Sequence, residues 1–320
     1  MRLAFKIFVF SVAFAFLSCN SDVFIDDFLQ KSASLSVTEE NRDATLKFNA
    51  DDWSLLDINS EYSNIFMEVT DLEGNFKALP FNNNEQGIVR CYNDYFELRI
   101  EKRHSRELQV IMLENLYDST LMFSVKVGNQ YAQKNIDINV GTMQKYRIDS
   151  VIYDWNEWKV FTNGVVLVDS LVVDNSKGTE PVSVTLYPYK TAERVIKLFY
   201  PNGVWEIFKE EYRKCLGIPL PQIVIPDLEG EHPILGDTRI VFGIEEQKLE
   251  TKLEKNLEVK KNVLAGDVRK LMVYNGIDEY TVPYKVYVSH PITGRQRIFK
   301  GELQSKCPKD YLVIPEKVMQ

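Results

Sequence analysis

The stretch Leu121-Met122-Phe123-Ser124-Val125-Lys126-Val127, followed by Gly128-Asn129, decides the fold of the first domain. All its odd-numbered residues before the turn are apolar, while Ser124 and Lys126 are polar. Successive side chains of a strand point to opposite faces, so this pattern predicts a half-buried strand that ends in a turn. Similar short segments, separated by turn residues, lie at 44–50, 65–70, 95–100 and 136–140. Such regular spacing is typical of an antiparallel sandwich, which we predict over residues 34–141.

One part of this domain also resembles a known family. The stretch Phe48-Asn49-Ala50-Asp51-Asp52-Trp53-Ser54, with the alternating strands that end at 136–140, resembles the small Ig-like BACON domains of Bacteroides-group surface proteins. The resemblance implies an Ig-like sandwich. Such domains often act as spacers or carbohydrate-associated modules, so it implies no site residue here.

The chain after residue 150 predicts a second, elongated antiparallel β domain that extends to residue 320. Its strand signals lie at 165–174, 181–187, 269–274, 280–288 and 297–303, with a turn expected at Asn275-Gly276. One short helix is predicted from Glu206 to Leu216, because Gly217 and Pro219 end it. The fold class is therefore mainly β, with two domains.

The charged segment 245–263 fits two structures. Leu249, Leu253 and Leu257 are spaced as on one face of a helix, and Glu, Lys and Leu favour helices. Odd positions are nevertheless mostly apolar and even positions polar, which is the period of a strand. The count of matches and the β-rich surroundings favour one long amphipathic strand.

The N-terminus has the pattern of an export signal. Arg2 and Lys6 precede the apolar run 7–17, which is shorter than the roughly 20 residues of a membrane-spanning helix. The following Phe16-Leu17-Ser18-Cys19 resembles the lipobox of bacterial lipoproteins, with Phe16 where that family usually has Leu, Val or Ile. The resemblance implies that residues 1–18 are removed and that Cys19 carries lipid. An ordinary signal peptide is the alternative.

A lipid on Cys19 would place the chain at the outer membrane or cell surface. Residues 19–33 would then be a tether. Acidic residues at 22, 26 and 27 in this tether resemble the surface-export signal of Bacteroides-group lipoproteins, and a plain solvated linker is equally compatible with them.

Charge and motifs exclude several classes of function. The chain has 38 basic and 46 acidic side chains, so phosphate backbones repel it and nucleic acid is not an expected partner. No His-Glu-x-x-His, Cys-x-x-Cys, Gly-x-Ser-x-Gly or P-loop motif occurs. We expect no metal, no cofactor and no enzymatic activity. Carboxylate pairs such as Asp51-Asp52 leave a glycosidase open.

Three cysteines remain besides Cys19, namely Cys91, Cys215 and Cys307. We expect them to be buried free thiols. A bridge between Cys215 and Cys307 is the alternative, because sequence does not show whether they lie close together.

Aromatic residues are the candidate ligand-binding residues. Tyr153, Trp155 and Trp158 occur in Tyr-Asp-Trp-Asn-Glu-Trp, and Tyr187 and Tyr189 follow. Aromatic rings beside Asp and Asn suit a sugar, since rings stack on its C–H surface and polar groups bind its hydroxyls. Packing at a domain boundary is the alternative role.

Two functions from different classes follow. The first is a lipid-anchored, non-catalytic surface protein that binds a glycan or a protein. The second rests on residues 243–303, which resemble the core of the aerolysin and epsilon-toxin family of β-pore formers. That resemblance is carried by the alternating segment, by Val263-Leu264-Ala265-Gly266, by Tyr280-Thr281-Val282-Pro283-Tyr284 and by the turn Thr293-Gly294. It implies a membrane-active protein, although the insertion hairpins of that family are rich in Ser and Thr and this segment is rich in Lys and Glu.

Overall fold

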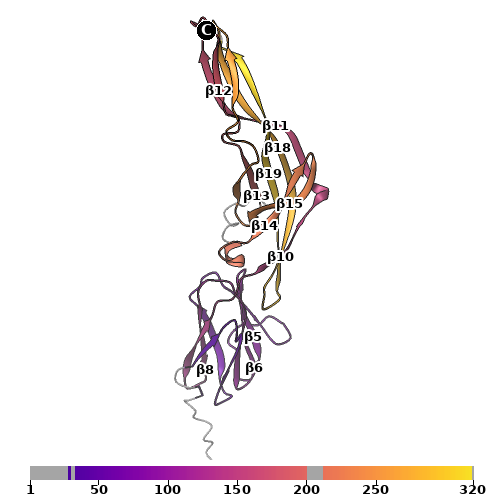
Figure 1. Ribbon diagram of the computed structural model, residues 1–320. Helices are drawn as coiled ribbons and strands as arrows, with labels where there is room; N and C mark the ends of the chain where they lie inside the picture. The colour runs from indigo at the N-terminus through magenta and orange to yellow at the C-terminus, as the bar shows by residue number, and fades with distance from the viewer. Residues whose placement is uncertain (1–27, 30–32, 200–211, 319–320) are drawn as a thin grey trace, which may run out of the picture. The chain divides into compact units, whose positions relative to one another are not determined.

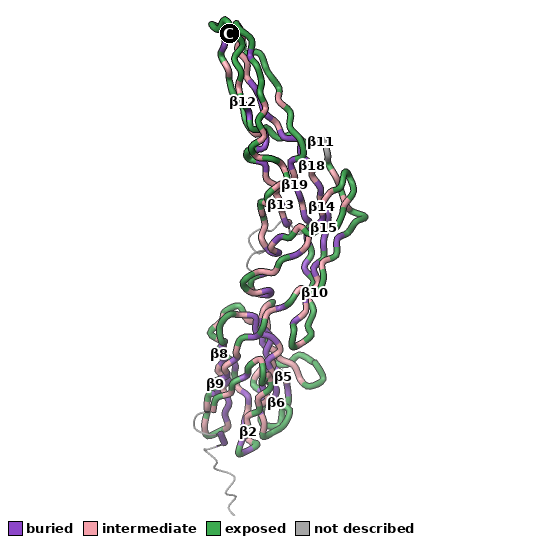
Figure 2. Tube along the Cα trace, viewed as in Figure 1, coloured by how far each residue is buried: buried purple, intermediate pink, exposed green. Residues whose placement is uncertain are grey.

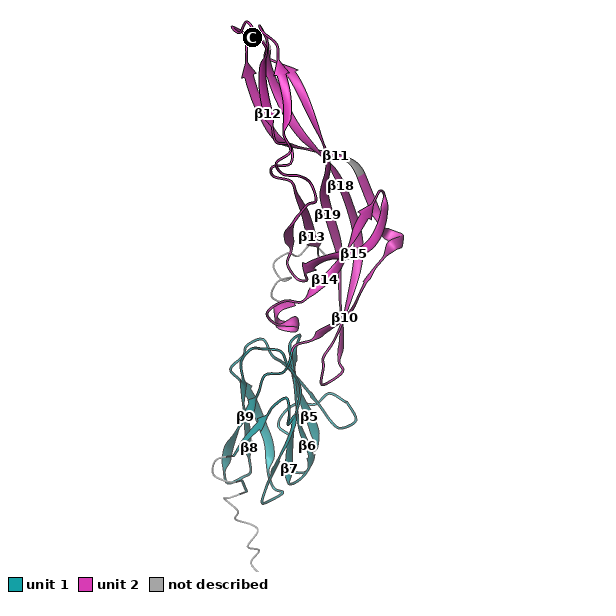
Figure 3. Ribbon diagram, in the orientation of Figure 1, with its two compact units in different colours: residues 1–144 teal, residues 145–320 magenta. Residues whose placement is uncertain are grey.

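The computed structural model describes residues 28–29, 33–199 and 212–318, with the side chains of 162 and 163 left out. It is mainly β, as the sequence predicted, with 62% strand and 3% helix. The chain forms two compact units, residues 1–144 and 145–320 (Figure 3). The signal peptide and Cys19 lie outside the described residues.

The N-terminal unit is a β-sandwich (Figure 1). One sheet has the order β1-β9-β8-β3 and the other β2-β7-β6-β5-β4. The pairing of β1 with β9 is parallel, and every other pairing in the two sheets is antiparallel. The strands are β1 (Ser34–Val37), β2 (Asp43–Lys47), β3 (Ser54–Ser60), β4 (Phe66–Thr70), β5 (Gly87–Asn93), β6 (Phe96–His104), β7 (Glu107–Asn115), β8 (Leu121–Gly128) and β9 (Gln133–Val140).

Alternation along the strands builds the core between the two sheets. In β8, Leu121, Phe123, Val125 and Val127 are buried, whereas Met122 is exposed. Buried and more exposed residues follow one another along the strands of this unit (Figure 2). This is the pattern from which the strand was predicted, and it makes one hydrophobic core from both sheets.

A buried lysine lies in this core. The Lys102 ammonium donates to the carbonyl oxygens of Trp53 at 3.1 Å and Asn83 at 3.1 Å, and also to that of Asn82. It lies 4.6 Å from the centre of the Trp53 ring. Burial lowers the pKa of Lys102 to about 8, because the charged form loses its hydration.

This lysine predicts a pH dependence of stability. An unfolded lysine titrates near 10.4, so between about pH 8 and pH 10 the unfolded chain holds a proton that the folded chain has lost. The free energy of unfolding should therefore rise with pH in this window, by about 2 kcal/mol from this residue. Denaturant titrations of wild type and Lys102→Met at each pH give the difference between the two. Parallel curves would contradict the shifted pKa.

The C-terminal unit is built around two strands of 22 residues each, β18 and β19. Its main sheet has the order β10-β18-β19-β13-β16 (Figure 1). On the same edge of β18, β11 pairs with residues 268–281 and β10 with residues 284–289. Two smaller sheets pair β12 with β17 and β14 with β15. The strands are β10 (Arg147–Tyr153), β11 (Lys159–Asp174), β12 (Val182–Leu186), β13 (Glu193–Phe199), β14 (Gln222–Glu229), β15 (His232–Val241), β16 (Glu246–Glu250), β17 (Val259–Val263), β18 (Val268–Ser289) and β19 (Gln296–Lys317).

The turn predicted at Asn275-Gly276 is wrong, because β18 continues through it. The register with β19 shifts between Gly276 and Ile277, so the pair marks a bulge. A Cβ on Gly276 would lie 1.8 Å from Oδ1 of Asp310. The glycine is needed for this close approach of β19 rather than for a chain reversal.

The single strand predicted over 245–263 is also wrong. β16 ends at Glu250 and pairs with β13, whereas β17 begins at Val259 and pairs with β12. The chain crosses between two sheets, and a turn closes where Leu257 N donates to Glu254 O at 3.0 Å. Side chains from 249 to 259 still alternate between half-buried and exposed, so the period was right and the continuous hydrogen bonding was not.

The predicted helix 206–216 lies partly outside the described residues. Residues 212–216 are helical, and Gly217 follows with φ +78°. Gly217 N donates to Arg213 O at 2.9 Å, which ends the helix as its sequence indicated.

The three described cysteines are free. Cys91 and Cys215 are buried, while Cys307 is half-buried, so the alternative bridge between Cys215 and Cys307 does not form. Burial raises the pKa of Cys91 to about 12, which keeps it as an unreactive thiol.

Candidate functional sites

The first candidate site is a row of aromatic rings beside β10. The chain leaves β10 through the 3-10 turn η2 (Trp155–Glu157), which Asp154 caps by accepting from Asn156 N at 3.1 Å. Ring centres of Tyr153 and Trp155 are 5.6 Å apart, and those of Trp155 and Trp158 are 5.9 Å apart. Trp158 stacks on Tyr280 of β18 at 4.3 Å.

The rings differ in exposure. Trp155 is 42% exposed, whereas Tyr153 and Tyr280 are buried and Trp158 is half-buried. The Tyr153 hydroxyl donates to Val224 O at 2.7 Å, and burial raises the pKa of Tyr280 to about 12. Tyr153 and Trp158 therefore attach the turn to the sheet, where Trp158 packs on Tyr280. The ring of Trp155 is the one that is exposed to solvent.

Alanine substitutions separate these roles. Trp158→Ala should lower the free energy of unfolding by about 2 kcal/mol, because its ring covers Tyr280. Trp155→Ala should cost under about 0.5 kcal/mol, since substitutions at exposed positions usually do. Thermal melts of the two variants test this. Equal losses would mean that Trp155 is a packing residue and would end its candidacy as a ligand contact.

Tyr187 and Tyr189 lie at a different part of the unit. The Tyr187 hydroxyl donates to Glu258 at 3.2 Å, and buried Tyr189 packs edge-on against Tyr311 at 5.5 Å. Tyr311 pairs with Asn275 of β18, whereas Tyr153 pairs with Tyr284. Nine residues along a strand correspond to about 30 Å, so the five predicted aromatics form two separate groups.

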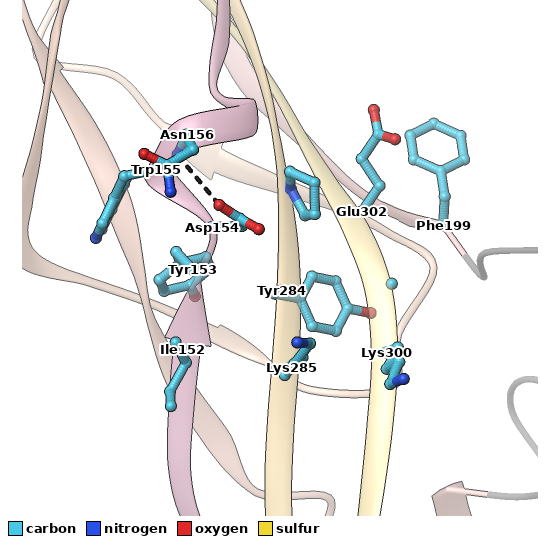
Figure 4. Close-up of a pocket in the computed structure, with 12 residues that line it drawn as sticks. Ile152, Tyr153, Asp154, Trp155, Asn156, Phe199, Tyr284, Lys285, Lys300 and Glu302 are labelled. Atoms are coloured by element: carbon cyan, nitrogen blue, oxygen red, sulfur yellow. Dashed lines mark hydrogen bonds between the residues drawn. The ribbon is translucent and has the colours of Figure 1, made fainter.

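A pocket lies beside the aromatic row (Figure 4). It has a volume of about 700 Å³, and its charged lining residues are Asp154, Lys285, Lys300 and Glu302. These four are exposed, while Tyr153, Tyr284 and Gly301 alternate with them along the strands and are buried. The pocket therefore opens on the outer face of the sheet made by β10, β18, β19 and β13, and we call it the outer-face pocket.

A second cavity of about 560 Å³ is lined by Arg194, Asp227 and Tyr280. The Arg194 guanidinium donates to Asp227, to Ser305 Oγ at 2.8 Å and to Pro226 O at 2.8 Å. The hydrogen bonds of Arg194 are thus made to other residues of the chain, and they hold β14 and β15 on the main sheet.

The second candidate site is an apolar sheet face. Beyond Lys306, β19 has no partner other than β18 among the described strands. Residues 164–174 of β11, 268–277 of β18 and 308–317 of β19 form a three-stranded part that we call the narrow sheet. Its inner face packs on β12 through Leu271, Val273 and Leu186, and β12 pairs with β17.

The outer face of the narrow sheet exposes apolar side chains on β11 and β19, while Tyr274 and Met272 of the central strand β18 are half-buried and buried. Leu167, Tyr274 and Leu312 lie side by side across the three strands, and Ser170, Met272 and Ile314 form the next row. Val165 is 62% exposed, Leu312 53% and Leu167 50%. Exposed apolar patches on soluble proteins are typical of contacts with other proteins or with membranes, so this face is a candidate contact surface.

Other chemistry is not apparent in the described part of the chain. It holds no group of three or more His, Cys, Asp or Glu residues that could bind a metal ion. None of its helices is long and apolar enough to cross a membrane.

Comparison with known proteins gives limited similarity. No family model and no curated sequence matches. Among solved structures, an aerolysin-like protein of Bombina maxima has 13% identity and a TM-score of 0.24, covering 53% of this chain and 97% of its own. The β-pore-forming protein Mpp75Aa1.1 of Brevibacillus laterosporus has 13% identity and a TM-score of 0.24, and the match covers 63% of this chain and 80% of that protein. Lamprey immune protein has 10% identity and a TM-score of 0.36, covering 86% and 98%.

The first two structures are aerolysin-like β-pore-forming proteins, the class that residues 243–303 resemble in sequence. Identities of 10–13% and TM-scores of 0.24–0.36 do not assign a function to this chain.

Sequence reasoning missed both the lysines of the outer-face pocket and the apolar face of the narrow sheet. Lys285 and Lys300 are fifteen positions apart, and only the β18–β19 register brings them together. The apolar face had a signal, since Val165, Leu167, Leu312 and Ile314 occupy alternate positions in two strands. The same alternation predicts a buried face equally well, so exposure could not be derived from it.

Proposed function

We propose that the chain is a membrane-active, non-catalytic β protein, and that the outer face of the narrow sheet is its lipid contact. The observation that carries this proposal is the apolar row of Leu167, Tyr274 and Leu312, in which Leu167 and Leu312 are exposed and Tyr274 is half-buried. Its burial in acyl chains would recover roughly 25 cal/mol for each Å² of apolar surface. This free energy is not gained while the face stays in water, so contact with lipid is favourable.

Lipid suits this face better than a pore lumen does. A transmembrane barrel strand alternates apolar and polar residues, with the polar ones lining the channel. In the narrow sheet the inner residues Leu271 and Val273 are apolar as well, and they are buried. The sheet therefore fits a membrane-docking element. Assembly into a β-pore is the finer form of the proposal and would require other strands to provide the polar face.

The export signal supports a location at a membrane. Lipid on Cys19 would hold the chain at the outer membrane or cell surface. Cys19→Ala should abolish palmitate labelling and leave an unprocessed precursor. Equal labelling of wild type and variant would contradict the anchor.

Vesicle binding tests the docking face. The chain from residue 19, carrying Cys19→Ser so that no lipid is attached, should sediment with phosphatidylcholine vesicles. Leu167→Glu with Leu312→Glu should weaken binding at least tenfold, because two charges enter the contact. Leu235→Glu is the matched control, since Leu235 is 63% exposed but lies on β15. Unchanged binding by the double variant would exclude this face, and release of an encapsulated dye tests pore formation.

Glycan or protein binding is the second candidate function. It is favoured by the exposed ring of Trp155 next to Asp154 and Asn156, which is the combination that sugar binding requires. A glycan array with the same Cys19→Ser chain tests it, and loss of any signal in Trp155→Ala would assign the site.

A further inference from the structure

The four charged side chains of the outer-face pocket form two rows of opposite sign. Lys285 on β18 directly opposes Lys300 on β19. Glu302 opposes Pro283, and Asp154 lies on the other side of Pro283, where Asp154 N donates to Pro283 O at 2.9 Å. The positive row and the negative row are thus one side-chain step apart on the same face (Figure 4).

The lysine pair is an unfavourable arrangement by itself. Side chains directly opposite in antiparallel strands have Cβ atoms about 5 Å apart, and like charges in such positions repel. Lys285 and Lys300 form no ion pair within the described part of the chain. On the other edge of β18, Lys285 is paired with Ile152, which supplies no charge. A phosphate bound between the two ammonium groups would relieve this repulsion.

The negative row suits a cation. Asp154 and Glu302 are two strand spacings apart, about 10 Å, with the side chain of Pro283 between them. Phe199 of β13 opposes Glu302 on its far side and also lines the pocket. A carboxylate on each side and an apolar floor are what an alkylated ammonium group requires, because it is cationic and has no strong need for hydrogen bonds.

We propose that the outer-face pocket binds a zwitterionic phosphate ester, the headgroup of a phosphocholine-type lipid. The phosphate lies between Lys285 and Lys300, and the quaternary ammonium lies over Pro283 between Asp154 and Glu302. Two residues along a strand span about 7 Å, which flexible lysine side chains readily close to the length of such a headgroup. A ligand with only negative charge is repelled by the carboxylates, and one with only positive charge is repelled by the lysines.

This inference rests on the proposed membrane contact only for the source of the ligand. Its test therefore uses a soluble probe first. Isothermal titration of the Cys19→Ser chain with phosphocholine should show one site, with inorganic phosphate and tetramethylammonium each at least tenfold weaker. Lys285→Glu should abolish the site and, by making a cross-strand ion pair with Lys300, should leave the melting temperature unchanged or raised. Loss of binding would then not reflect unfolding.

Two further variants separate the halves of the site. Glu302→Gln should weaken phosphocholine binding at least fivefold and should strengthen the binding of inorganic phosphate, because one carboxylate that repels phosphate is removed. Lys260→Glu is the charge-matched control, because Lys260 is exposed and lies on β17, and this variant should bind as wild type. Equal affinity for phosphocholine and inorganic phosphate would overturn the proposal, as would wild-type affinity in Lys285→Glu or displacement of the probe by a neutral oligosaccharide.

Vesicles identify the source. Binding should be stronger to phosphatidylcholine than to phosphatidylglycerol vesicles, and Lys285→Glu should remove that preference. Phosphocholine binding that survives Leu167→Glu with Leu312→Glu, while vesicle binding is lost, would support both proposals. Vesicle binding without any phosphocholine binding would overturn this one alone.

Discussion

Trp53→Ala is expected to lower the free energy of unfolding of the N-terminal unit by about 3–5 kcal/mol, a large part of the roughly 5–15 kcal/mol that a domain has. Trp53 is fully buried and stacks on Phe48 with ring centres 3.9 Å apart. Its indole N–H donates to Ser105 O, and the Lys102 ammonium lies over its ring. Truncation would leave a cavity, a carbonyl without its donor and a buried cation without its ring.

Calorimetry of the full chain measures this loss, because the two units contribute separate transitions if they unfold independently. Phe76→Ala is the control, since Phe76 is an aromatic residue of the same unit that is 80% exposed. It should shift the transition little. A Trp53→Ala protein that melts like Phe76→Ala would show that this core does not depend on the indole.

Arg194→Met should destabilise the C-terminal unit by about 3–5 kcal/mol, because it leaves a partly buried carboxylate uncompensated. The Arg194 side chain is 11% exposed and connects β13 to β14 through Asp227 and Pro226, and to β18 through the Tyr280 hydroxyl at 3.1 Å. The Thr238 hydroxyl donates to the same Asp227 at 2.8 Å, which ties in β15. The same guanidinium donates to Ser305 Oγ of β19 at 2.8 Å, so it connects five strands.

The double variant Arg194→Met with Asp227→Asn should recover part of this loss, since it removes the unpaired charge. Denaturant titrations of both variants give the coupling free energy between the two residues. Lys248→Met is the control, because Lys248 is 60% exposed and its contact with Glu193, at 3.4 Å, is a surface ion pair worth under about 1 kcal/mol. Equal losses in Arg194→Met and Lys248→Met would contradict the role of Arg194.

Local pattern explains why the fold class could be predicted. Leu121 to Val127 alternates in sequence and in burial, because the side-chain period of a strand does not depend on its partner. The segment 249–259 shows the other side of the same rule. Its side chains alternate as predicted, yet β16 and β17 belong to different sheets. Period shows which face a residue occupies, and pairing depends on residues far away in the chain.

The candidate site was predictable only in part, for the same reason. Tyr153, Trp155 and Trp158 are neighbours in sequence and stay together in the structure. Tyr187 and Tyr189 were grouped with them by residue type, and strand register separates them. Gly276 was misread because the same residue serves a turn and a close strand approach, and only Asp310 on the neighbouring strand distinguishes the two.

The long strands also set the order in which the chain can fold. Among the described strands, β10 and β11 pair with β18 alone. Lys159 therefore cannot pair until Thr281 is present, and Arg147 cannot pair until Ser289 is present, both more than a hundred residues further along. Pairs so distant close slowly, because the loop between them must lose its entropy first. On a ribosome the sandwich would be complete while β10 and β11 still lacked their partner. The nascent C-terminal unit would then expose its apolar strands until β18 emerged, which makes that interval the time when a chaperone is most needed.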